Sequence, residues 1–367
     1  MRVLMVAKDL QLHGITNFIV SYYRILRTDG VEMDFAVGMP ADEELVKEIQ
    51  AHGGLITLLP EKTEDPKGYY KGLNRAMQLK QYDILHVNGN SATISVELFL
   101  GVINRIPFRI AHSHNTMCNH VWAHKLLSPV FHLMYTQGLA CSELAGRWMF
   151  GKHAFAVIPN GFDTKKFIFN PQNRYSIRDL YGISENFVVG HIGFFNKQKN
   201  HGRIVSIFKE LKRIQPKAKL LLVGDGYTRK DIEKKVEEIG IQEDVIFAGI
   251  SKEIPQYLSA MDSFLFPSLF EGLGIVLLEA QINGLPCVLS DVVPNAAKLG
   301  ENYYPQSLNA SDLTWAEAVS RCTVQLEDRQ NFYAEHENEI SKYEITKNGE
   351  KLFDIYKKAE EMQRNKR

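Results

Sequence analysis

The stretch that decides the fold is FLFPSLFEGLGIVLLEA, residues 264–280. Its first three residues form a short apolar run that ends at Pro267, and we predict a buried strand there, since proline cannot donate a ladder hydrogen bond. Two glycines then supply a loop that can approach a ligand closely, and a helix is predicted over 275–281. The unpaired N–H groups at such a helix start favour an anion, so a phosphate is the expected guest.

Two carboxylates flank this predicted anion site. Glu271 stands directly before the glycine loop, and Glu279 lies inside the predicted helix. Because carboxylates aimed at a phosphate would repel it, they are expected to hold neutral hydroxyl groups beside it, and sugar hydroxyls fit that description. An exposed helical position is the alternative for Glu279. Its neighbours Leu277, Leu278 and Ala280 favour a buried helix, whose acid needs polar partners.

Length and composition indicate a globular protein of two domains. The chain has 367 residues, 45% of them hydrophobic and 23% charged, which suggests two domains of roughly 100–200 residues each. With 43 basic and 43 acidic residues the formal net charge is zero, so no nucleic-acid partner is expected. No apolar span approaches the roughly 20 residues of a membrane helix, and the opening MRVLMVA is too short for a signal peptide. We expect a cytoplasmic protein.

The cysteines indicate reduced thiols. The chain has four, scattered without a Cys-x-x-Cys pair, so neither a disulfide framework nor a cysteine-built zinc site is expected. They are Cys118, Cys141, Cys287 and Cys322.

Short apolar runs alternate with longer amphipathic segments along both halves of the chain. In the first half we predict strands at Val3–Ala7, Met33–Val37, Ile84–Val87 and Arg109–His114, with helices over 16–28, 42–52, 92–104 and 120–136. In the second half strands are predicted at 187–192, 219–223, 245–248, 263–266 and 286–289. This alternation predicts an α/β fold with parallel sheets covered by helices on both faces. The polar stretch 163–185 is interpreted as the link between the halves.

The order strand, Glu, Gly-x-Gly, helix, Glu resembles the glutamate-pair motif of the family 4 retaining glycosyltransferases. Similar motifs follow in the same order as in that family: IPNGFD at 158–163, GFFNKQKNHGRIVSIFKEL at 193–211, KLLLVGDG at 219–226, VIFAG at 245–249 and FPSLFEGLGIVLLEAQINGLPCVLSD at 266–291. RIAHSHNT at 109–116 resembles the capsule and exopolysaccharide branch. The resemblance spans nearly the whole chain and is sharpest over 158–291.

The resemblance implies the GT-B fold, two Rossmann-like doubly wound parallel-sheet domains that face each other across a cleft. Residues 1–165 would bind the acceptor, and 166–345 would bind the nucleotide sugar. The last segment, 346–367, would form a helix that crosses back to the first domain; a helix packed on its own domain is the alternative.

The resemblance also assigns site residues. His114 would lie beside the transferred sugar, Lys199 would offset charge on the departing diphosphate, Glu271 would hold donor-sugar hydroxyls, and Glu279 the ribose. The remaining donor-binding residues would be Gly14, Gly193, Asn196, Gly224, Gly249, Ile250, Gly272, Leu273, Gly274, Ile275 and Val276. Family members commonly carry two adjacent glycines at the first of these loops, where this chain has His13 before Gly14. For VGDG at 223–226, a turn without any ligand contact is the alternative to donor binding.

The His-x-His pair allows a second interpretation. His112 and His114 stand two apart at a strand end and would share one side of the pleat, so they could bind zinc with His86 as third ligand. No acid or thiol obviously completes that shell, and the preferred interpretation assigns no metal. His112 is then a structural or neighbouring polar residue.

One position departs from the family. Phe194 stands where the family normally has an arginine, and phenylalanine offers no charged fork for phosphate. Arg203 is the candidate substitute, with a solvated surface side chain as the alternative. A nucleotide-sugar-binding protein that turns over poorly is therefore an alternative function, as is a nucleotide-sugar epimerase or hydrolase on the same fold.

The resulting prediction is a metal-independent, retaining hexosyltransferase without a cofactor. The expected donor is a nucleotide diphosphate sugar, with UDP-sugar preferred. The expected acceptor is a hydroxyl of a growing, lipid-linked polysaccharide precursor. Segment 120–136 carries aromatic, aliphatic and basic residues that could contact the inner membrane face. An ordinary core-facing helix is the preferred alternative there, because Pro129 interrupts an ideal amphipathic helix.

Overall fold

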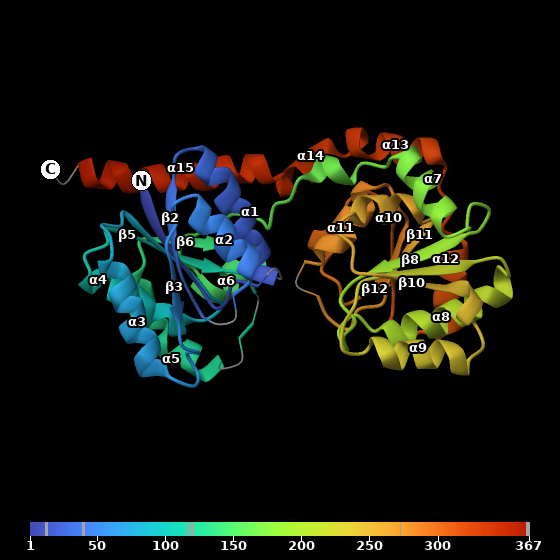
Figure 1. Cartoon of the computed structure of the whole chain (residues 1–367), viewed down its shortest axis with the longest axis horizontal. Coiled ribbons are helices and arrows are strands. Elements are labelled where there is room, and N and C mark those ends of the chain that lie inside the picture. The colour runs from blue at the N-terminus through green and yellow to red at the C-terminus, as the bar shows by residue number, and fades with distance from the viewer. Residues whose placement is uncertain (12–13, 39–40, 116, 119–120, 272, 365–367) are drawn as a thin grey trace. The chain divides into compact units, whose positions relative to one another are not determined.

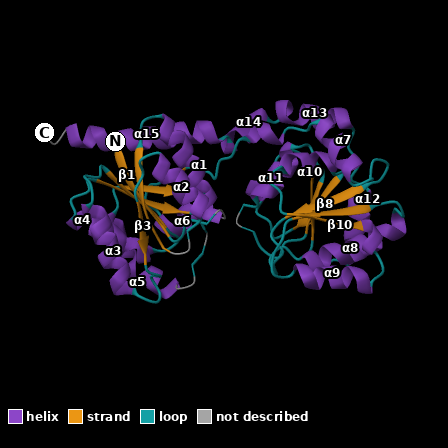
Figure 2. Ribbon diagram, viewed as in Figure 1, coloured by secondary structure: helices purple, strands orange, loops and turns teal. Residues whose placement is uncertain are grey.

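The structure is a computed structural model that describes residues 1–11, 14–38, 41–115, 117–118, 121–271 and 273–364. The chain divides into two compact units. Unit 1 comprises Met1–Phe162 together with Lys342–Arg367, and unit 2 comprises Asp163–Ser341. In each unit helices cover both faces of a parallel sheet, as Figures 1 and 2 show. The α/β class predicted from the alternation of apolar runs is confirmed.

In the described residues of unit 1, seven strands pair in parallel in the order β3-β2-β1-β4-β5-β6-β7. The strands are β1 Arg2–Ala7, β2 Glu32–Gly38, β3 Ile56–Leu59, β4 Ile84–Asn88, β5 Phe108–Ser113, β6 Gln137–Ala140 and β7 Ala156–Val157. The helices are α1 Gly14–Thr28, α2 Glu43–Ala51, α3 Pro66–Gln78, α4 Ser95–Ile103, α5 Val121–Met134, α6 Glu143–Phe150 and α15 Ile345–Arg364, with a short 3₁₀ turn, η1, at Ala92–Ile94.

The two faces of this sheet have separate cores. On one face α1, α2 and α15 pack on the strands through side chains such as Tyr22, Ile49 and Tyr356. On the other face α3, α4 and α6 do so, with Leu73 and Phe150 among the buried residues. The last helix of the chain therefore belongs to the core of unit 1 (Figure 1).

The described part of unit 2 holds six strands, all parallel, in the order β10-β9-β8-β11-β12-β13. The strands are β8 Val188–Ile192, β9 Lys219–Val223, β10 Val245–Gly249, β11 Ser263–Phe266, β12 Cys287–Ser290 and β13 Tyr303–Gln306. The helices are α7 Pro171–Leu180, α8 His201–Ile214, α9 Arg229–Glu238, α10 Ile254–Ala260, α11 Ile275–Ile282, α12 Asp312–Ser320, α13 Leu326–Glu335 and α14 Glu337–Ile340.

The interpretation of residues 163–185 as a linker is wrong. The stretch contains α7, which packs on α10 within unit 2. Arg174 on this helix donates to Asp262 at 2.6 Å, and Arg178 donates to the other oxygen of the same carboxylate. In the sequence this stretch resembles a solvated linker, because Asp262, the partner of both arginines, lies 88 residues from Arg174 and 84 from Arg178.

The helix predicted over 120–136 packs on the core, although its proline does not interrupt it. Its described part, α5, continues through Pro129 and buries His124 and Phe131. One side of the helix therefore faces the core, as expected, and the other side leaves a row of large hydrophobic side chains exposed. They are Val121, Trp122, Leu126, Val130 and Leu133.

Each sheet has one point at which the strand order reverses. In unit 1 the point lies between β1 and β4, and in unit 2 between β8 and β11. Ligands of open parallel sheets bind outside the carboxyl ends of strands at such points. The loops that follow these four strands are therefore the places where functional side chains are expected to gather.

Candidate functional site

The loop between β11 and α11 forms the centre of the site in unit 2. Gly274 caps α11 in a left-handed conformation, with φ +74° and ψ 63°, which other residues adopt only with strain. A Cβ at this position would lie 3.5 Å from the ring of Phe266. Ile275 and Val276 begin the helix, and no described residue accepts a hydrogen bond from their N–H groups. The helix start can therefore bind an anion.

Lys199 and Glu271 form an ion pair in the loops that follow β8 and β11. Nζ of Lys199 lies 2.7 Å from Oε1 of Glu271, and the side chains are 16% and 6% exposed, respectively. The ammonium also lies 4.8 Å from the centre of the Phe266 ring. A lysine ammonium has three donor hydrogens, and a carboxylate has further lone pairs. The pair can therefore hold an anion on the lysine side and hydroxyl groups on the glutamate side.

Hydrogen bonds made by two asparagine side chains hold the loop around Lys199 in place. Oδ1 of Asn196 accepts a hydrogen bond from the Lys199 N–H at 2.9 Å. Asn200 adopts a left-handed φ of 58° as the N-cap of α8, and its Nδ2 donates to the carbonyl of Pro267 at 3.2 Å. The loop after β8 is thus hydrogen-bonded to the loop after β11. Sequence analysis predicted Asn196 and Lys199 as donor contacts, and the structure brings them together with Glu271.

Glu279 lies in α11 beside the fully buried Leu277 and Leu278. Burial raises the pKa of Glu279 to about 7. Among the residues that the structure describes, none forms a hydrogen bond or ion pair with this carboxyl group. The side chain is half-buried, and an acid without a partner is costly to desolvate, which is the condition under which a bound ligand would supply the hydrogen bonds. Gly272 lies outside the described residues, and Leu273 follows it in the loop before Gly274.

The glycines directly after β8 and β9 and the glycine that ends β10 pack backbone against backbone. The N–H of Gly224 donates to the carbonyl of Gly249 at 2.8 Å. A Cβ at Gly224 would lie 2.1 Å from the carbonyl oxygen of Gly193, and φ at Gly224 is +133°. Only glycine fits there, so close strand packing by itself explains the glycine of VGDG. Ile250, directly after β10, is 80% exposed.

Arg203 is not placed as a substitute for the arginine that the family resemblance leads us to expect at position 194. Its guanidinium donates to the carbonyls of Leu308 and Ala310 and lies 3.3 Å from the carboxylate of Asp312. These contacts connect α8 to the segment before α12. They engage the guanidinium group of Arg203 with partners inside unit 2. Phe194 is 55% exposed, with its ring 5.8 Å from that of Tyr227. The substitution hypothesis for Arg203 is therefore wrong, and the residue has a structural role.

In unit 1, His114 follows β5 and is held by two asparagines. Its backbone N–H donates to Oδ1 of Asn90 at 2.9 Å, and its Nε2 lies 2.8 Å from Oδ1 of Asn88. Nδ2 of Asn88 donates to the carbonyl of Val6, so Oδ1 is the acceptor and His114 carries its proton on Nε2. Burial lowers the pKa of His114 to about 3. The imidazole is therefore neutral at physiological pH, with Nδ1 as an acceptor.

The other two histidines form a hydrogen-bonded pair beneath it. Nε2 of His86 lies 3.0 Å from Nδ1 of His112, and Nδ1 of His86 lies 2.7 Å from the hydroxyl of Tyr356. The ring of His112 stacks on that of His114, with centroids 4.2 Å apart. Both ring nitrogens of His86 are thus engaged, which argues against its service as a zinc ligand. In the described ranges no group of three or more His, Cys, Asp or Glu residues could hold a metal ion.

The predicted residues divide between the two units. Gly14, the first residue of α1, and His114 belong to unit 1. The other predicted residues that the structure describes belong to unit 2, where Asn196, Lys199 and Glu271 lie together. Sequence reasoning missed Asn88, although a polar residue directly after a predicted strand is a signal that could have found it. It also missed Tyr356, because nothing local in the last helix indicates its contact with a histidine.

Comparisons with known proteins cover the whole chain. A sequence model of glycosyl transferases group 1 matches residues 175–346. The putative glycosyltransferase EpsF of Bacillus subtilis is 27% identical over 380 residues, covering 100% of this chain and 98% of EpsF. The Escherichia coli UDP-Gal:alpha-D-GlcNAc-diphosphoundecaprenol alpha-1,3-galactosyltransferase is 26% identical over 61% of each chain. The amylovoran biosynthesis glycosyltransferase AmsD of Erwinia amylovora is 30% identical over 35% of this chain and 36% of its own.

Among solved structures, the fold is similar to that of Anabaena HepE in complex with UDP and glucose. The TM-score is 0.76, with 18% identity, and the match covers 98% of this chain and 100% of HepE. The likeness extends across both units and establishes the two-domain fold.

Proposed function

Because the chain belongs to the group 1 glycosyltransferases and has the GT-B fold, we propose that it moves a sugar from a nucleotide diphosphate sugar to a growing, lipid-linked polysaccharide precursor. A UDP-sugar is the proposed donor. The solved HepE complex contains UDP, and the Escherichia coli relative is named for UDP-galactose and a diphosphoundecaprenol acceptor. AmsD is named for polysaccharide biosynthesis.

The observation that carries this proposal is the Lys199–Glu271 pair beside the start of α11. The ammonium, 2.7 Å from the carboxylate oxygen, and the free N–H groups of the helix start favour a diphosphate. Glu271 would repel phosphate oxygens, so it is assigned to hydroxyls of the donor sugar. Glu279, which lacks a partner among the described residues, is assigned to the ribose hydroxyls.

The proposed reaction proceeds with retention of configuration. The bond between the sugar C1 and the diphosphate oxygen breaks, and the acceptor oxygen bonds to C1 on the same face. The acceptor hydroxyl gives its proton to the departing diphosphate, so no side-chain nucleophile is needed. Lys199 stabilises the negative charge that grows on the diphosphate as the bond breaks. Neutral His114 accepts a hydrogen bond at Nδ1 beside the transferred sugar, and no metal takes part.

The test compares the Lys199–Glu271 pair with an exposed pair in the same unit. We expect Lys199→Ala and Glu271→Ala to lower kcat by about 10²–10³, as when a transition-state contact is lost. The control variants Lys298→Ala and Glu301→Ala disrupt a pair whose side chains are 41% and 94% exposed, and they should stay within about twofold. Undiminished transfer by either site variant would refute the assigned roles. A chelator should leave activity unchanged.

Donor binding can be measured separately by thermal shift with UDP, GDP, ADP and their sugars. A ligand that binds only the folded protein raises its melting temperature by mass action. We expect UDP compounds to give the largest shift, and Lys199→Ala to reduce it. An equal response to all three bases would contradict the proposed UDP preference.

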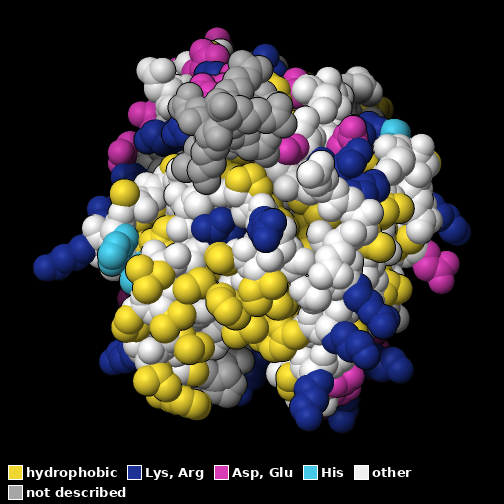
Figure 3. Space-filling view, turned by 90° about the vertical axis from the view of Figure 1, so that its left-hand side faces the viewer, with side chains coloured by type: hydrophobic (Ala, Val, Ile, Leu, Met, Phe, Trp, Pro, Cys, Tyr) yellow, Lys and Arg dark blue, Asp and Glu magenta, His cyan; other side chains and the backbone are white. Residues whose placement is uncertain are grey.

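An apolar surface on unit 1 supports the lipid-linked acceptor and a membrane contact. Helices α4 and α5 pack together, and both expose large hydrophobic side chains. On α4 they are Val96, Phe99, Val102 and Ile103, and on α5 Val121, Trp122, Leu126, Val130 and Leu133. Figure 3, which views the molecule from the side of α4, shows hydrophobic side chains gathered on this face with lysines and arginines near them. Patches of this kind mark interaction sites, and an apolar face with basic neighbours suits an anionic bilayer.

This surface would attach the protein to the bilayer without spanning it. None of the described helices is long and apolar enough to cross a membrane. We expect cosedimentation with vesicles that contain phosphatidylglycerol, and its loss in Trp122→Ser/Leu126→Ser. The control is Leu79→Ser, which changes a side chain 57% exposed outside this surface. Equal cosedimentation of all three proteins would refute the membrane contact.

Phe194 favours a second candidate, a protein that binds nucleotide sugar with little turnover. The position lacks the family's arginine, and Arg203 is committed to Leu308 and Ala310. Nucleotide binding by calorimetry without transfer or donor hydrolysis would support this candidate. Product analysis without acceptor would distinguish an epimerase or a hydrolase from both.

A further inference from the structure

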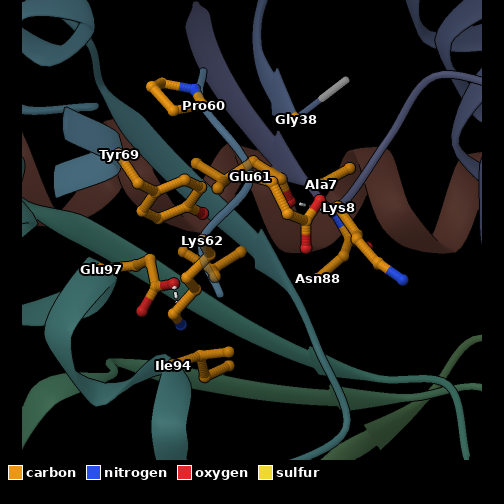
Figure 4. Close-up of a pocket in the computed structure, with 12 residues that line it drawn as sticks. Ala7, Lys8, Gly38, Pro60, Glu61, Lys62, Tyr69, Asn88, Ile94 and Glu97 are labelled. Carbon is orange, nitrogen blue, oxygen red and sulfur yellow. Dashed lines mark hydrogen bonds and ion pairs between the residues drawn. The ribbon is translucent and has the colours of Figure 1, made fainter. Parts of the chain in front are cut away.

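A cavity of about 120 Å³, with both apolar and charged residues in its walls, lies outside the carboxyl ends of β1 to β4 in unit 1. Its volume is several times the roughly 10–15 Å³ that one water molecule needs. The cavity therefore has room for a polar group larger than water. Its walls include Asn88, Lys62, Tyr69 and Glu97 (Figure 4). This is the edge of the sheet where strand order reverses and where His114 lies.

The most buried charge in its wall is Glu97, in the first turn of α4, with 2% exposure. Oε1 of Glu97 lies 2.6 Å from Nζ of Lys62, and Figure 4 shows the two side chains pointing toward each other. Oε2 of Glu97 is buried without a partner at hydrogen-bond geometry among the described residues, and the hydroxyl of Tyr69 lies near this carboxylate. Native proteins seldom leave such an oxygen unpaired, so Oε2 is a candidate acceptor for a ligand's hydrogen.

Lys62 supplies the complementary donor. Its ammonium lies 5.7 Å from the ring centre of Tyr69 and 5.4 Å from that of Tyr70. Burial acts to lower the pKa of Lys62, but the carboxylate of Glu97 raises it overall, so the ion pair stays charged. One ammonium hydrogen points to Glu97 and another interacts with the hydroxyl of Tyr70, which leaves one hydrogen that can reach a guest. The cavity thus offers an acceptor and a donor side by side.

The charges of the cavity select the guest. Besides Lys62 and Glu97, Lys8 and Glu61 line it, so two ammonium groups balance two carboxylates. An anionic guest would face the buried carboxylate of Glu97, and a cationic guest would compete with Lys62. A neutral group that both donates and accepts hydrogen bonds avoids both penalties. Sugar hydroxyls are such groups.

On the basis of the proposed function, we infer that this cavity is a subsite for a neutral sugar residue of the acceptor, held by Oε2 of Glu97 and Nζ of Lys62. Asn88 connects the subsite to the predicted catalytic histidine, because it lines the cavity and its Oδ1 lies 2.8 Å from Nε2 of His114. The acceptor specified in this way carries hydroxyls, not a carboxylate or phosphate, on the sugar that enters the cavity.

The test is saturation-transfer NMR on the full-length protein. The probes are the methyl glycosides of glucose, galactose and N-acetylglucosamine, with glucuronate as the anionic comparison. We expect a neutral glycoside to bind the wild type, and Glu97→Gln and Lys62→Met to weaken it by at least about tenfold. Glu97→Asp keeps the negative charge but moves the carboxylate away from the cavity by one methylene group. It serves as a further variant if one of these fails to fold.

The matched control is Lys80→Met. Lys80 is a partly buried lysine, 24% exposed, that pairs with the buried Asp34 at 3.0 Å in the same unit and does not line the cavity. Retained glycoside binding in this variant, together with its loss in the cavity variants, supports the subsite. Retained binding in the folded Glu97 variants, or stronger binding of glucuronate than of every neutral glycoside, overturns it.

Two further measurements separate this inference from the proposed function. If the wild type shows neither a UDP thermal shift nor transfer, but glycoside binding depends on Glu97, the transferase proposal fails and the sugar subsite stands. If UDP binding and transfer persist and the KM for acceptor is unchanged in Glu97→Gln, the subsite is refuted and the transferase proposal stands.

Discussion

The hydroxyl of Tyr356 lies 2.7 Å from Nδ1 of His86, so the last helix of the chain is hydrogen-bonded to the central strands of the unit 1 sheet. Both side chains are fully buried. His86 in turn is hydrogen-bonded to His112, and the ring of His112 stacks on that of His114. The C-terminal helix therefore completes the core beneath the histidine that follows β5.

We predict that Tyr356→Phe destabilises the protein. The variant keeps the ring but leaves Nδ1 of His86 buried without a partner, which costs about 1–3 kcal/mol. Thermal unfolding should show the loss as a lower melting temperature. Tyr175→Phe is the control, because that side chain is 63% exposed. Equal melting temperatures of both variants and the wild type would contradict the prediction.

The pH dependence of stability should reveal the carboxyl group of Glu279. Its pKa is raised by burial to about 7, from the ordinary value of 4.5. The folded state therefore binds an extra proton between these two values. The stabilisation is fully present below pH 4.5 and is lost as the pH rises through about 7. The full shift corresponds to roughly 3 kcal/mol at most.

Glu279→Gln isolates this effect. Relative to the wild type, the variant should be more stable at pH 8 and nearly equal at pH 5, as measured by urea unfolding. The buried His86 and His114 have pKa values lowered to about 3 and give the opposite slope below pH 6.5, but they cancel in the comparison. Glu301→Gln, at a position whose side chain is 94% exposed, serves as control. A pH-independent difference would refute the shifted pKa.

Two glycines with nearly the same positive φ allow backbone strain to be distinguished from a role in binding. Gly274 has φ +74° and Gly240 has φ +73°, and neither would place a Cβ closer than 3.5 Å to another atom. Alanine at either position should cost about 1–2 kcal/mol of stability. We expect Gly274→Ala to weaken UDP binding in addition, since it shifts the start of α11, whereas Gly240→Ala should not. Calorimetric titration with UDP decides this, and equal affinities would contradict the role of the helix start.

Asp262 should be essential for the stability of unit 2. Its carboxylate accepts hydrogen bonds from Arg174 and Arg178 on α7, and from the N–H of Val188 at 2.7 Å. Asp262→Asn leaves buried guanidinium charge without its counterion, which costs about 3–5 kcal/mol. Urea unfolding should show this loss, and limited proteolysis should cut near α7. Asp354→Asn, with a side chain 71% exposed, should behave like the wild type.

The sequence predicted most of the interior strands and the edge strand β10, but it missed β6 in the interior and the edge strands β3, β7 and β13. Strands such as β8 and β11 are buried at every position, so they appear as continuous apolar runs. In contrast β3 and β13 leave part of their residues accessible, and their pattern resembles that of loops. The helix α7 was missed because its polar residues resemble a solvated loop in the sequence. Its arginines form ion pairs with Asp262, which is distant in the sequence.

From the sequence alone, the chemistry of the site and its position in the fold could be inferred. Lys199, Glu271 and His114 each follow a predicted strand, and parallel strands bring such residues to one edge of their sheet. Only the tertiary structure decided which side chains pair: Lys199 with Glu271, and Lys62 with Glu97. The partners in these pairs are separated by 72 and 35 residues. Their contact depends on strand order and loop path, which no local pattern of residues specifies.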